Sequence, residues 1–229
     1  MKLSPVSENA VLITLGDEIS EALTPQILTL KALVEDDLGD VLLDIIPSYT
    51  TLLVIYDLHL LTLEAARARL RQCLARLNDA LTQAAEGRQV DIPVWYDSAV
   101  GYDLETLARD INLSVDEAIR LHTGKTYQVF ALGFNPGFGF LVKVDKRLVS
   151  PRHATPREQV AAGSVGIADA QTAVYPKASP GGWQIIGRSP TRLFDPDKPL
   201  DEAALLRVGD RVRFRAVSRD EFVALGGTV

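Results

Sequence analysis

The sequence is poor in cysteine and histidine, and each shortage narrows the chemistry that it can support. The single cysteine, Cys73, excludes an internal disulfide. The three histidines stand far apart, at positions 59, 122 and 153, and none has a cysteine or a second histidine at ligand spacing. A Gly-x-Ser-x-Gly nucleophile motif is also missing. We therefore predict neither a metal site nor a catalytic triad in this chain.

Long apolar runs and a net positive charge are absent as well. No stretch reaches about 18 consecutive apolar residues, the length that spans a membrane, and the N-terminus lacks the pattern of a signal peptide. A formal net charge of -6 has the wrong sign for a general nucleic-acid or anionic-membrane binder. Hydrophobic residues make up 47% of the 229 residues, which is ample for a packed core. We expect a soluble cytoplasmic protein that binds neither nucleic acid nor membranes.

The first 96 residues alternate between strand-like and helix-like patterns. Short runs rich in β-branched residues predict strands, and apolar residues at helical spacing predict helices. In chain order we predict a strand at 10–15, a helix at 24–38, strands at 41–46 and 51–56, a helix at 62–86 and a strand at 90–96. The order β-α-β-β-α-β is that of the split βαβ, or ferredoxin-like, fold.

After residue 96 the pattern changes. Two short helices are predicted at 103–110 and 114–122, and Ser114 with Glu117 forms a capping box at the start of the second. From residue 126 to 192, short runs of Val, Ile, Phe and Tyr alternate with Gly and Pro, which is typical of a β-barrel or sandwich. We expect an α+β protein with two domains, residues 1–90 and residues 91–229.

Residues 134–192 differ in charge from the rest of the chain. They carry eight basic side chains against three acidic ones. Arginine binds carboxylate or phosphate through two hydrogen bonds, and glycine-rich turns let backbone N–H groups approach an anion closely. Arg152, Arg157 and Arg188, which each adjoin Pro or Gly, make this segment a candidate anion site. The alternative is that these side chains are solvated on the outer faces of strands.

The same segment contains three clusters of small residues, GFNPGFGF at 133–140, AAGSVGIAD at 161–169 and SPGGW at 179–183. None of them matches a P-loop or a Rossmann fingerprint, so no motif supports nucleotide binding. His122 lies in the last turn of a predicted helix. It has two alternative roles there, pairing with the helix dipole or acting in a site.

The motifs of the second half resemble a known family. The strings YQVFALGFNPGFGFL, PREQVAAGSVGIADAQTAVYP and SPGGWQIIGRSPTRLFD are similar to the family that holds the B subunit of 5-oxoprolinase, subunit 1 of allophanate-hydrolase-type proteins and the sporulation kinase inhibitor of bacilli. The resemblance is dense over residues 122–195 and looser toward the N-terminus. It implies a small N-terminal α/β domain followed by a cyclophilin-like β-barrel.

The resemblance also implies an activity. It indicates a hydrolase subunit of a hetero-oligomeric complex that converts 5-oxo-L-proline to L-glutamate, with ATP as a cosubstrate of the complex. The implied partners are the C and A subunits of 5-oxoprolinase, and this chain is expected to be inactive without them. Opening an unreactive lactam with ATP requires cationic donors more than a nucleophilic side chain.

Site residues are carried over from the family motifs. The expected catalytic group consists of His122, which moves or orients a proton, and three arginines that clamp a carboxylate or phosphoryl group, Arg152, Arg157 and Arg188. The expected substrate-binding residues are Gly133, Phe134, Pro136, Gly137, Phe138, Gly163, Ser164, Gln171, Tyr175, Gly181, Gly182 and Trp183.

Two other functions fit the same resemblance. The first is a binding module that inhibits a histidine kinase, in which exposed aromatic residues such as Phe138, Phe140 and Trp183 contact the kinase. The second is a subunit of an allophanate- or urea-processing enzyme, which keeps the fold and changes the substrate. The residues alone leave both alternatives open.

Overall fold

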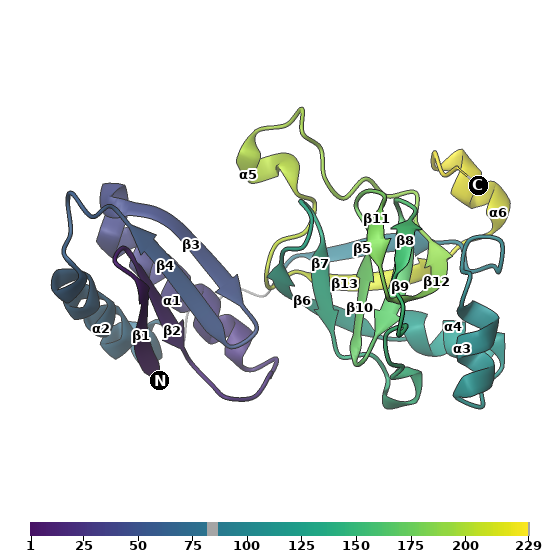
Figure 1. Ribbon diagram of the computed structural model, residues 1–229, viewed down its shortest axis with the longest axis horizontal. Coiled ribbons are helices and arrows are strands. Elements are labelled where there is room, and N and C mark those ends of the chain that lie inside the picture. Colours follow the sequence, from purple (N-terminus) through teal and green to yellow (C-terminus); the bar gives the residue numbers. More distant parts are fainter. Residues whose placement is uncertain (82–86, 229) are drawn as a thin grey trace. The chain divides into compact units, whose positions relative to one another are not determined.

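The computed structural model describes residues 1–81 and 87–228 and divides into two compact units, Met1–Glu86 and Gly87–Val229 (Figure 1). In these described residues it is a mixed α/β protein with six α-helices and mostly antiparallel strand pairing. A boundary after residue 90 would cut the strand β5 (Gln89–Val94), which pairs along its whole length inside the second unit. The boundary between the two units therefore lies before β5, between Glu86 and Gly87, and not after residue 90 as predicted.

The first unit packs two helices with an antiparallel sheet. Its elements are β1 (Lys2–Ser7), β2 (Ala10–Thr14), α1 (Leu23–Leu38), β3 (Leu42–Ser48), β4 (Thr51–Tyr56) and α2 (Leu63–Ala80). The strand order is β1-β2-β4-β3, and each neighbouring pair is antiparallel. Helix α1 connects β2 to β3, and β4 lies between these two strands in the sheet.

The core of this unit follows directly from the sequence periodicity. In β4 alternate residues, Leu52, Val54 and Tyr56, are buried, as expected for a sheet with one covered face. The buried stripe of α1 is Ile27, Leu30, Val34 and Leu38, and that of α2 is Ala66, Leu70, Cys73 and Leu77. These residues belong to one hydrophobic cluster. The stripes recur every three or four residues, which places them on one face of each helix.

The prediction of a fourth ferredoxin-like strand at 90–96 is wrong. The place beside β2 is taken by β1, which the sequence patterns did not indicate. The strand predicted at 90–96 exists as β5, but it pairs in parallel with β13 (Arg211–Ala216) in the second unit. Strand-like sequence is a local property, whereas the choice of partner depends on residues far along the chain.

The second unit contains the remaining strands and four short helices among its described residues. After β5 these are α3 (Leu104–Asp110), α4 (Val115–Thr123), β6 (Thr126–Leu132), β7 (Gly139–Val142), β8 (Arg157–Val160), β9 (Ser164–Ala168), β10 (Gln171–Val174), β11 (Ser179–Gly181), β12 (Gln184–Arg188), α5 (Leu200–Ala203), β13 and α6 (Arg219–Ala224). The capping box predicted for α4 is confirmed, with Ser114 and Glu117 each bonded to the other's backbone N–H.

Within this unit the strands follow the order β5-β13-β6-β7-β10-β9-β12. All of these pairs are antiparallel except β5 with β13. A backbone bridge between Trp95, just after β5, and Arg188, the last residue of β12, links the two ends of this order. Strands β8 and β11 form a separate two-stranded ribbon.

Both faces of the sheet are covered around β9, whose five residues are all buried. Val165 and Ile167 join the larger core of the unit. Ala168 joins a smaller cluster with Val160 of the ribbon and with Phe138, Tyr175 and Trp183. Because side chains alternate along a strand, the two clusters lie on opposite faces of the sheet. The smaller cluster forms the base of the site described below.

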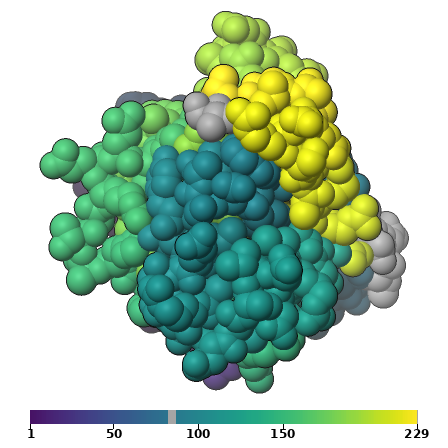
Figure 2. Space-filling view, turned by 90° about the vertical axis from the view of Figure 1, so that its right-hand side faces the viewer, coloured from purple at the N-terminus to yellow at the C-terminus, as the bar shows by residue number. Residues whose placement is uncertain are grey.

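Helices α3 and α4 and the C-terminal residues around α6 cover one side of this unit, where they appear in teal and yellow (Figure 2). None of the helices in residues 1–81 and 87–228 combines the length and the apolar character needed to cross a membrane.

Candidate functional site

A pocket of about 320 Å³ opens over the smaller cluster of the second unit. We call it the aromatic pocket. Its lining consists of Phe134, Phe138, Phe140, Arg152, Pro156, Tyr175, Pro180, Gly181, Gly182 and Trp183. One arginine among aromatic rings and small residues suits a small ligand with an apolar ring and a negative charge.

The turn between β6 and β7 places Phe134 at the rim of this pocket. The turn is closed by hydrogen bonds from Gly133 N–H to the Phe138 carbonyl at 3.2 Å and from Phe138 N–H to the Asn135 carbonyl at 3.0 Å. Phe134 has a φ of 66° and is 62% exposed. A large aromatic residue in the left-handed region is strained. The fold therefore holds an exposed ring in an unfavourable backbone conformation, which points to a function for that ring.

The other rings pack edge-on around Phe138. Phe138 and Trp183 are buried, so the expectation that both are exposed for contact with a kinase is wrong. The ring centroid of Phe138 lies 4.9 Å from that of Phe140, 5.5 Å from Tyr175 and 5.7 Å from Trp183. The Tyr175 and Trp183 rings meet Phe138 at 85° and 87°, a favourable arrangement of aromatic quadrupoles. This contact network fixes the floor of the pocket.

Arg152 is held over the pocket by the backbone on either side of it. The Gln184 side chain donates to the Pro151 carbonyl at 2.9 Å, and His153 N–H donates to the Gly182 carbonyl at 2.7 Å. The guanidinium carbon of Arg152 then lies 5.7 Å from the Trp183 ring centroid, within the range of a cation–π contact.

The donors of Arg152 remain available to a ligand. Its one charged neighbour among the described residues is Asp169, at 3.8 Å, and both side chains are more than half exposed. Such a solvent-exposed pair is weak. Within the described part of the chain the Arg152 guanidinium group donates no hydrogen bond to protein.

Gly181 and Tyr175 lie close together in the lining of the aromatic pocket. A Cβ atom at Gly181 would lie 2.2 Å from the Tyr175 hydroxyl oxygen, so only glycine fits there. Burial raises the pKa of Tyr175, while a hydrogen bond from the Trp183 backbone and the charges of Arg152 and Arg157 partly lower it. The tyrosine is a neutral wall of the pocket at physiological pH.

The structure brings seven of the predicted site residues together in this lining: Phe134, Phe138, Arg152, Tyr175, Gly181, Gly182 and Trp183. Gly133, Pro136 and Gly137 belong to the turn that carries Phe134. Ser164, preceded by Gly163, begins β9, and Gln171 begins β10. These six residues shape the surroundings and do not line the pocket.

Two N–H groups of the glycine turns that were expected to cradle an anion have partners within the fold. Gly133 N–H donates to the Phe138 carbonyl, and Gly163 N–H donates to the Tyr175 carbonyl at 2.7 Å. These donors are therefore used inside the fold. Gly137 and Gly163 have φ of 81° and 78°, so glycine serves backbone geometry at both positions.

His122 lies in the core, outside the aromatic pocket. It is fully buried, its Nδ1 lies 2.7 Å from the Tyr96 hydroxyl, and its Nε2 lies 2.9 Å from the Thr172 hydroxyl. Its ring stacks on Phe214 with centroids 4.5 Å apart. We call His122, Tyr96, Thr172 and Phe214 the histidine cluster.

Burial lowers the pKa of His122 from 6.5 to about 3, so the ring is neutral. Thr172 donates its own hydroxyl hydrogen to the Gly166 carbonyl at 2.9 Å. It therefore accepts from His122 Nε2–H, and Nδ1 accepts from Tyr96. Both ring nitrogens are occupied by protein groups, which favours a structural role for His122 over the predicted proton transfer.

Arg157 and Arg188 also lie outside the pocket lining. Arg157 donates to the Asp103 carboxylate at 2.6 Å, and Asp103, which is 6% exposed, also accepts from Ile185 N–H at 2.7 Å. Arg188 donates to the Tyr102 hydroxyl at 3.0 Å and to the Thr228 carbonyl at 3.2 Å. The three arginines therefore do not form one clamp, because two of them are engaged with protein groups.

Sequence reasoning missed the two residues that hold these arginines, Tyr102 and Asp103. Asp103 precedes α3, where an acidic residue is expected to cap the helix. Its side chain makes no capping hydrogen bond and turns to Arg157 and Ile185 instead. No local signal separates these two uses of an aspartate.

No set of three or more His, Cys, Asp or Glu side chains in the described ranges is arranged to hold a metal ion. The aromatic pocket offers one cation and apolar walls, which suits binding of an organic acid.

Comparison with known proteins defines the class. The chain belongs to the carboxyltransferase domain family, subdomains C and D, whose family model matches residues 1–206. Its fold is shared with the urea carboxylase of Kluyveromyces lactis, at a TM-score of 0.70 and 18% identity, over 97% of this chain and 22% of that one.

Closer relatives carry a specific name. The chain is 36% identical over 233 residues to a protein of Bacillus subtilis (strain 168) that is named as the B subunit of 5-oxoprolinase, covering 97% of this chain and 95% of that protein. It is 50% identical over 129 residues to the protein of the same name from Escherichia coli O157:H7, covering 56% of this chain and 58% of that one.

Two solved structures are also similar. PH0987 from Pyrococcus horikoshii is 38% identical with a TM-score of 0.57, over 96% of this chain and all of that one. TTHA0988 is 37% identical with a TM-score of 0.78, over 93% of this chain. This chain spans 40% of the length of TTHA0988.

Proposed function

We propose that this chain is the B subunit of a 5-oxoprolinase complex, which converts 5-oxo-L-proline to L-glutamate with hydrolysis of ATP. The observation that carries the proposal is the 36% identity, over 97% of the chain, to a protein named as the B subunit of 5-oxoprolinase. The A and C subunits of the enzyme are the proposed partners, and the complex is assigned to the cytoplasm, where a lone cysteine stays reduced.

The aromatic pocket supports this substrate class. 5-Oxoproline is a small five-membered lactam that bears one carboxylate. Its ring matches the walls formed by Phe134, Phe138 and Trp183, and its carboxylate matches the free donors of Arg152. A volume of about 320 Å³ is at the small end of ligand pockets, which run from roughly 300 to 1,000 Å³.

The proposed chemistry needs no nucleophilic side chain from this subunit. ATP phosphorylates the lactam carbonyl oxygen and leaves as ADP, and one water attacks the activated carbon as the C–N bond breaks. A second water releases phosphate and L-glutamate. Arg152 binds and orients the substrate carboxylate, and the aromatic rings exclude water from the ring face. Groups that bind ATP are assigned to the assembled complex.

The finer fold assignment is also a proposal. We infer that the second unit is a cyclophilin-like barrel, and the bridge between Trp95 and Arg188 supports closure of its sheet. In the first unit, the place of β4 between β2 and β3 supports a ferredoxin-like arrangement in which β1 substitutes for the usual last strand.

Reconstitution tests the function. The chain is combined with the A and C subunits, and phosphate release is measured with and without 5-oxo-L-proline. We expect release that depends on 5-oxo-L-proline only when every subunit is present. Equal release without this chain would contradict the proposal. Capture of a histidine kinase by the chain, with no such turnover, would favour the kinase-inhibitor function instead.

A further inference from the structure

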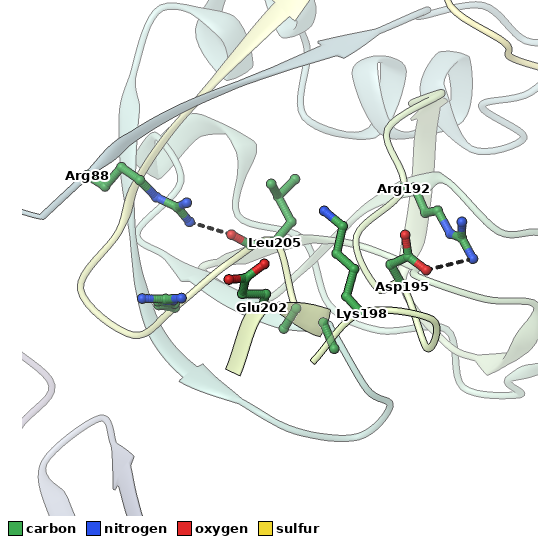
Figure 3. Close-up of a pocket in the computed structure, with 9 residues that line it drawn as sticks. Arg88, Arg192, Asp195, Lys198, Glu202 and Leu205 are labelled. Atoms are coloured by element: carbon green, nitrogen blue, oxygen red, sulfur yellow. Dashed lines mark hydrogen bonds and ion pairs between the residues drawn. The ribbon is translucent and has the colours of Figure 1, made fainter. Parts of the chain in front are cut away.

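A second pocket in the Gly87–Val229 unit is lined mainly by charged side chains (Figure 3). Its volume is about 310 Å³. We call it the charged pocket. It is lined by Arg88, Arg192, Asp195, Lys198, Glu202, Ala203, Ala204, Leu205 and Arg207. None of these residues belongs to the aromatic pocket or to the site predicted from the motifs.

The loop that forms most of this pocket is closed at its base. Phe194 and Ala204 form a backbone bridge, Asp195 N–H donates to the Ala203 carbonyl at 2.8 Å, and Leu205 N–H donates to the Leu193 carbonyl at 2.9 Å. Helix α5 lies within this loop. The base is therefore fixed, and the charged side chains are carried on a defined frame.

Two of the four cations in the lining are paired within the protein. Arg88 lies 2.8 Å from the buried carboxylate of Asp210 and also donates to the Leu205 carbonyl. Arg192 lies 3.2 Å from Asp195 and 3.9 Å from Asp197. These charges are compensated before any ligand binds.

Three charged groups of the lining keep no charged partner. Among the described residues, Lys198 and Glu202 have no ion pair and no side-chain hydrogen bond. The side chain of Arg207 has one partner there, the Asp201 carbonyl oxygen at 2.9 Å. Figure 3 shows Lys198 and Glu202 extending into the space between Arg88 and Arg192. Two cations and one carboxylate of the lining therefore lack a charged partner in the described part of the chain, and we call them the free groups.

We propose that the charged pocket binds an acidic α-amino acid. Such a ligand carries two carboxylates and one ammonium group, the inverse of the free groups in the pocket. Lys198 and Arg207 bind the carboxylates, and Glu202 binds the ammonium group. A plain phosphate is disfavoured, because the unpaired carboxylate of Glu202 would repel it. The choice of L-glutamate as the ligand to test rests on the proposed function, of which it is the product.

Isothermal titration calorimetry on the full chain tests this site with three small molecules. L-Glutamate has all three charged groups, glutarate lacks the ammonium group, and 5-oxo-L-proline lacks both the ammonium group and the second carboxylate. We expect L-glutamate to bind to the charged pocket about tenfold more tightly than glutarate, the factor for one charge-assisted hydrogen bond. 5-Oxo-L-proline is expected to bind independently of Lys198 and Glu202, in the aromatic pocket.

Two variants assign the binding to this pocket. Lys198→Ala is expected to weaken L-glutamate binding about tenfold, and Glu202→Gln is expected to remove the preference for L-glutamate over glutarate. Lys146→Ala and Glu158→Gln, at exposed positions outside the pocket, are matched controls that should leave binding unchanged.

Equal affinity of the wild type for L-glutamate and glutarate would overturn the proposal. So would no L-glutamate binding at all, or L-glutamate binding that neither pocket variant weakens. This test needs no turnover, whereas the proposed function is tested by turnover of the complex. Failure of one is therefore distinguishable from failure of the other.

Discussion

The aromatic pocket and the histidine cluster each combine aromatic rings with one basic side chain, yet only the pocket is available to a ligand. In the aromatic pocket, Phe134 is exposed and the Arg152 guanidinium group donates to no protein group in the described part of the chain. In the histidine cluster, both ring nitrogens of His122 are bonded to side chains and the ring is stacked on Phe214.

This difference shows that residue type alone does not mark a functional group. A buried polar side chain with every donor and acceptor satisfied stabilises the fold. A cation held in place by its backbone, with unused donors, is prepared for a ligand. The histidine cluster is therefore expected to affect stability, and the aromatic pocket is expected to affect turnover.

The largest expected effect is that of Arg152→Ala on the reconstituted complex. Loss of a charged contact to the substrate should lower kcat/KM for 5-oxo-L-proline by about 10²-fold, in the range observed when one preorganised donor is removed. The melting temperature should fall by only about 2–4 °C, because the ion pair of Arg152 is weak and its exposed cation–π contact with Trp183 contributes about 0.5–1 kcal/mol. Steady-state kinetics and thermal melting measure the two effects.

Lys146→Ala is the matched control, since it removes one exposed positive charge elsewhere in the unit. If both variants lower kcat/KM equally, Arg152 acts only through the general charge of the protein, and the aromatic pocket is not the substrate site.

The next expected effect is a pH dependence of stability that arises from His122. Its pKa is about 3 in the folded protein and about 6.5 in an unfolded chain. Between these values the unfolded state binds the additional proton, so the free energy of unfolding falls as pH falls. This stabilisation is present in full well above pH 6.5. About 2 kcal/mol of it is lost between pH 7 and pH 5.

Urea unfolding at pH 7 and pH 5 measures this loss. His122→Gln keeps a donor and an acceptor but cannot titrate. Between pH 7 and pH 5 the free energy of unfolding of this variant should therefore fall by about 2 kcal/mol less than that of the wild type. His59→Gln, at an exposed position of the first unit, should behave like the wild type. An equal pH dependence in His122→Gln would show that His122 is not the group responsible.

The sequence patterns predicted which segments are strands and helices better than they predicted which segments pair. Strand β4 and helices α1 and α2 follow from local periodicity. Strand β1 was missed because half of its sequence, KLSPVS, is polar and because it contains a proline, which a strand tolerates at a sheet edge. Strand β5 was predicted as a strand but assigned to the wrong sheet, since its partner β13 begins at Arg211.

The site was predictable to the extent that family motifs carry it. Five of the seven motif residues that line the aromatic pocket come from two short segments, the turn before β7 and the residues around β11. Arg157 and Arg188 were assigned to the same clamp because their partners could not be identified from the sequence. Asp103 is 54 residues from Arg157, and Tyr102 is 86 residues from Arg188. Only the folded chain brings these groups together.

The smallest expected effect comes from Phe134, where two variants distinguish the contribution of the ring from that of the strained backbone. Phe134→Gly removes the ring and relieves the left-handed conformation at φ 66°. The KM for 5-oxo-L-proline should rise roughly three- to tenfold, the value of one aromatic contact of about 0.5–1.5 kcal/mol. Phe134→Ala removes the same ring but keeps the backbone strain. It should show the same KM with a free energy of unfolding about 1 kcal/mol lower than Phe134→Gly.

Kinetics on the complex and urea unfolding on the chain therefore report on different properties of one residue. An unchanged KM in both variants would show that the exposed ring does not contact substrate, and the aromatic pocket would then resemble the histidine cluster in being structural. A raised KM with equal stability of the two variants would keep the ring in the site and remove the argument from backbone strain.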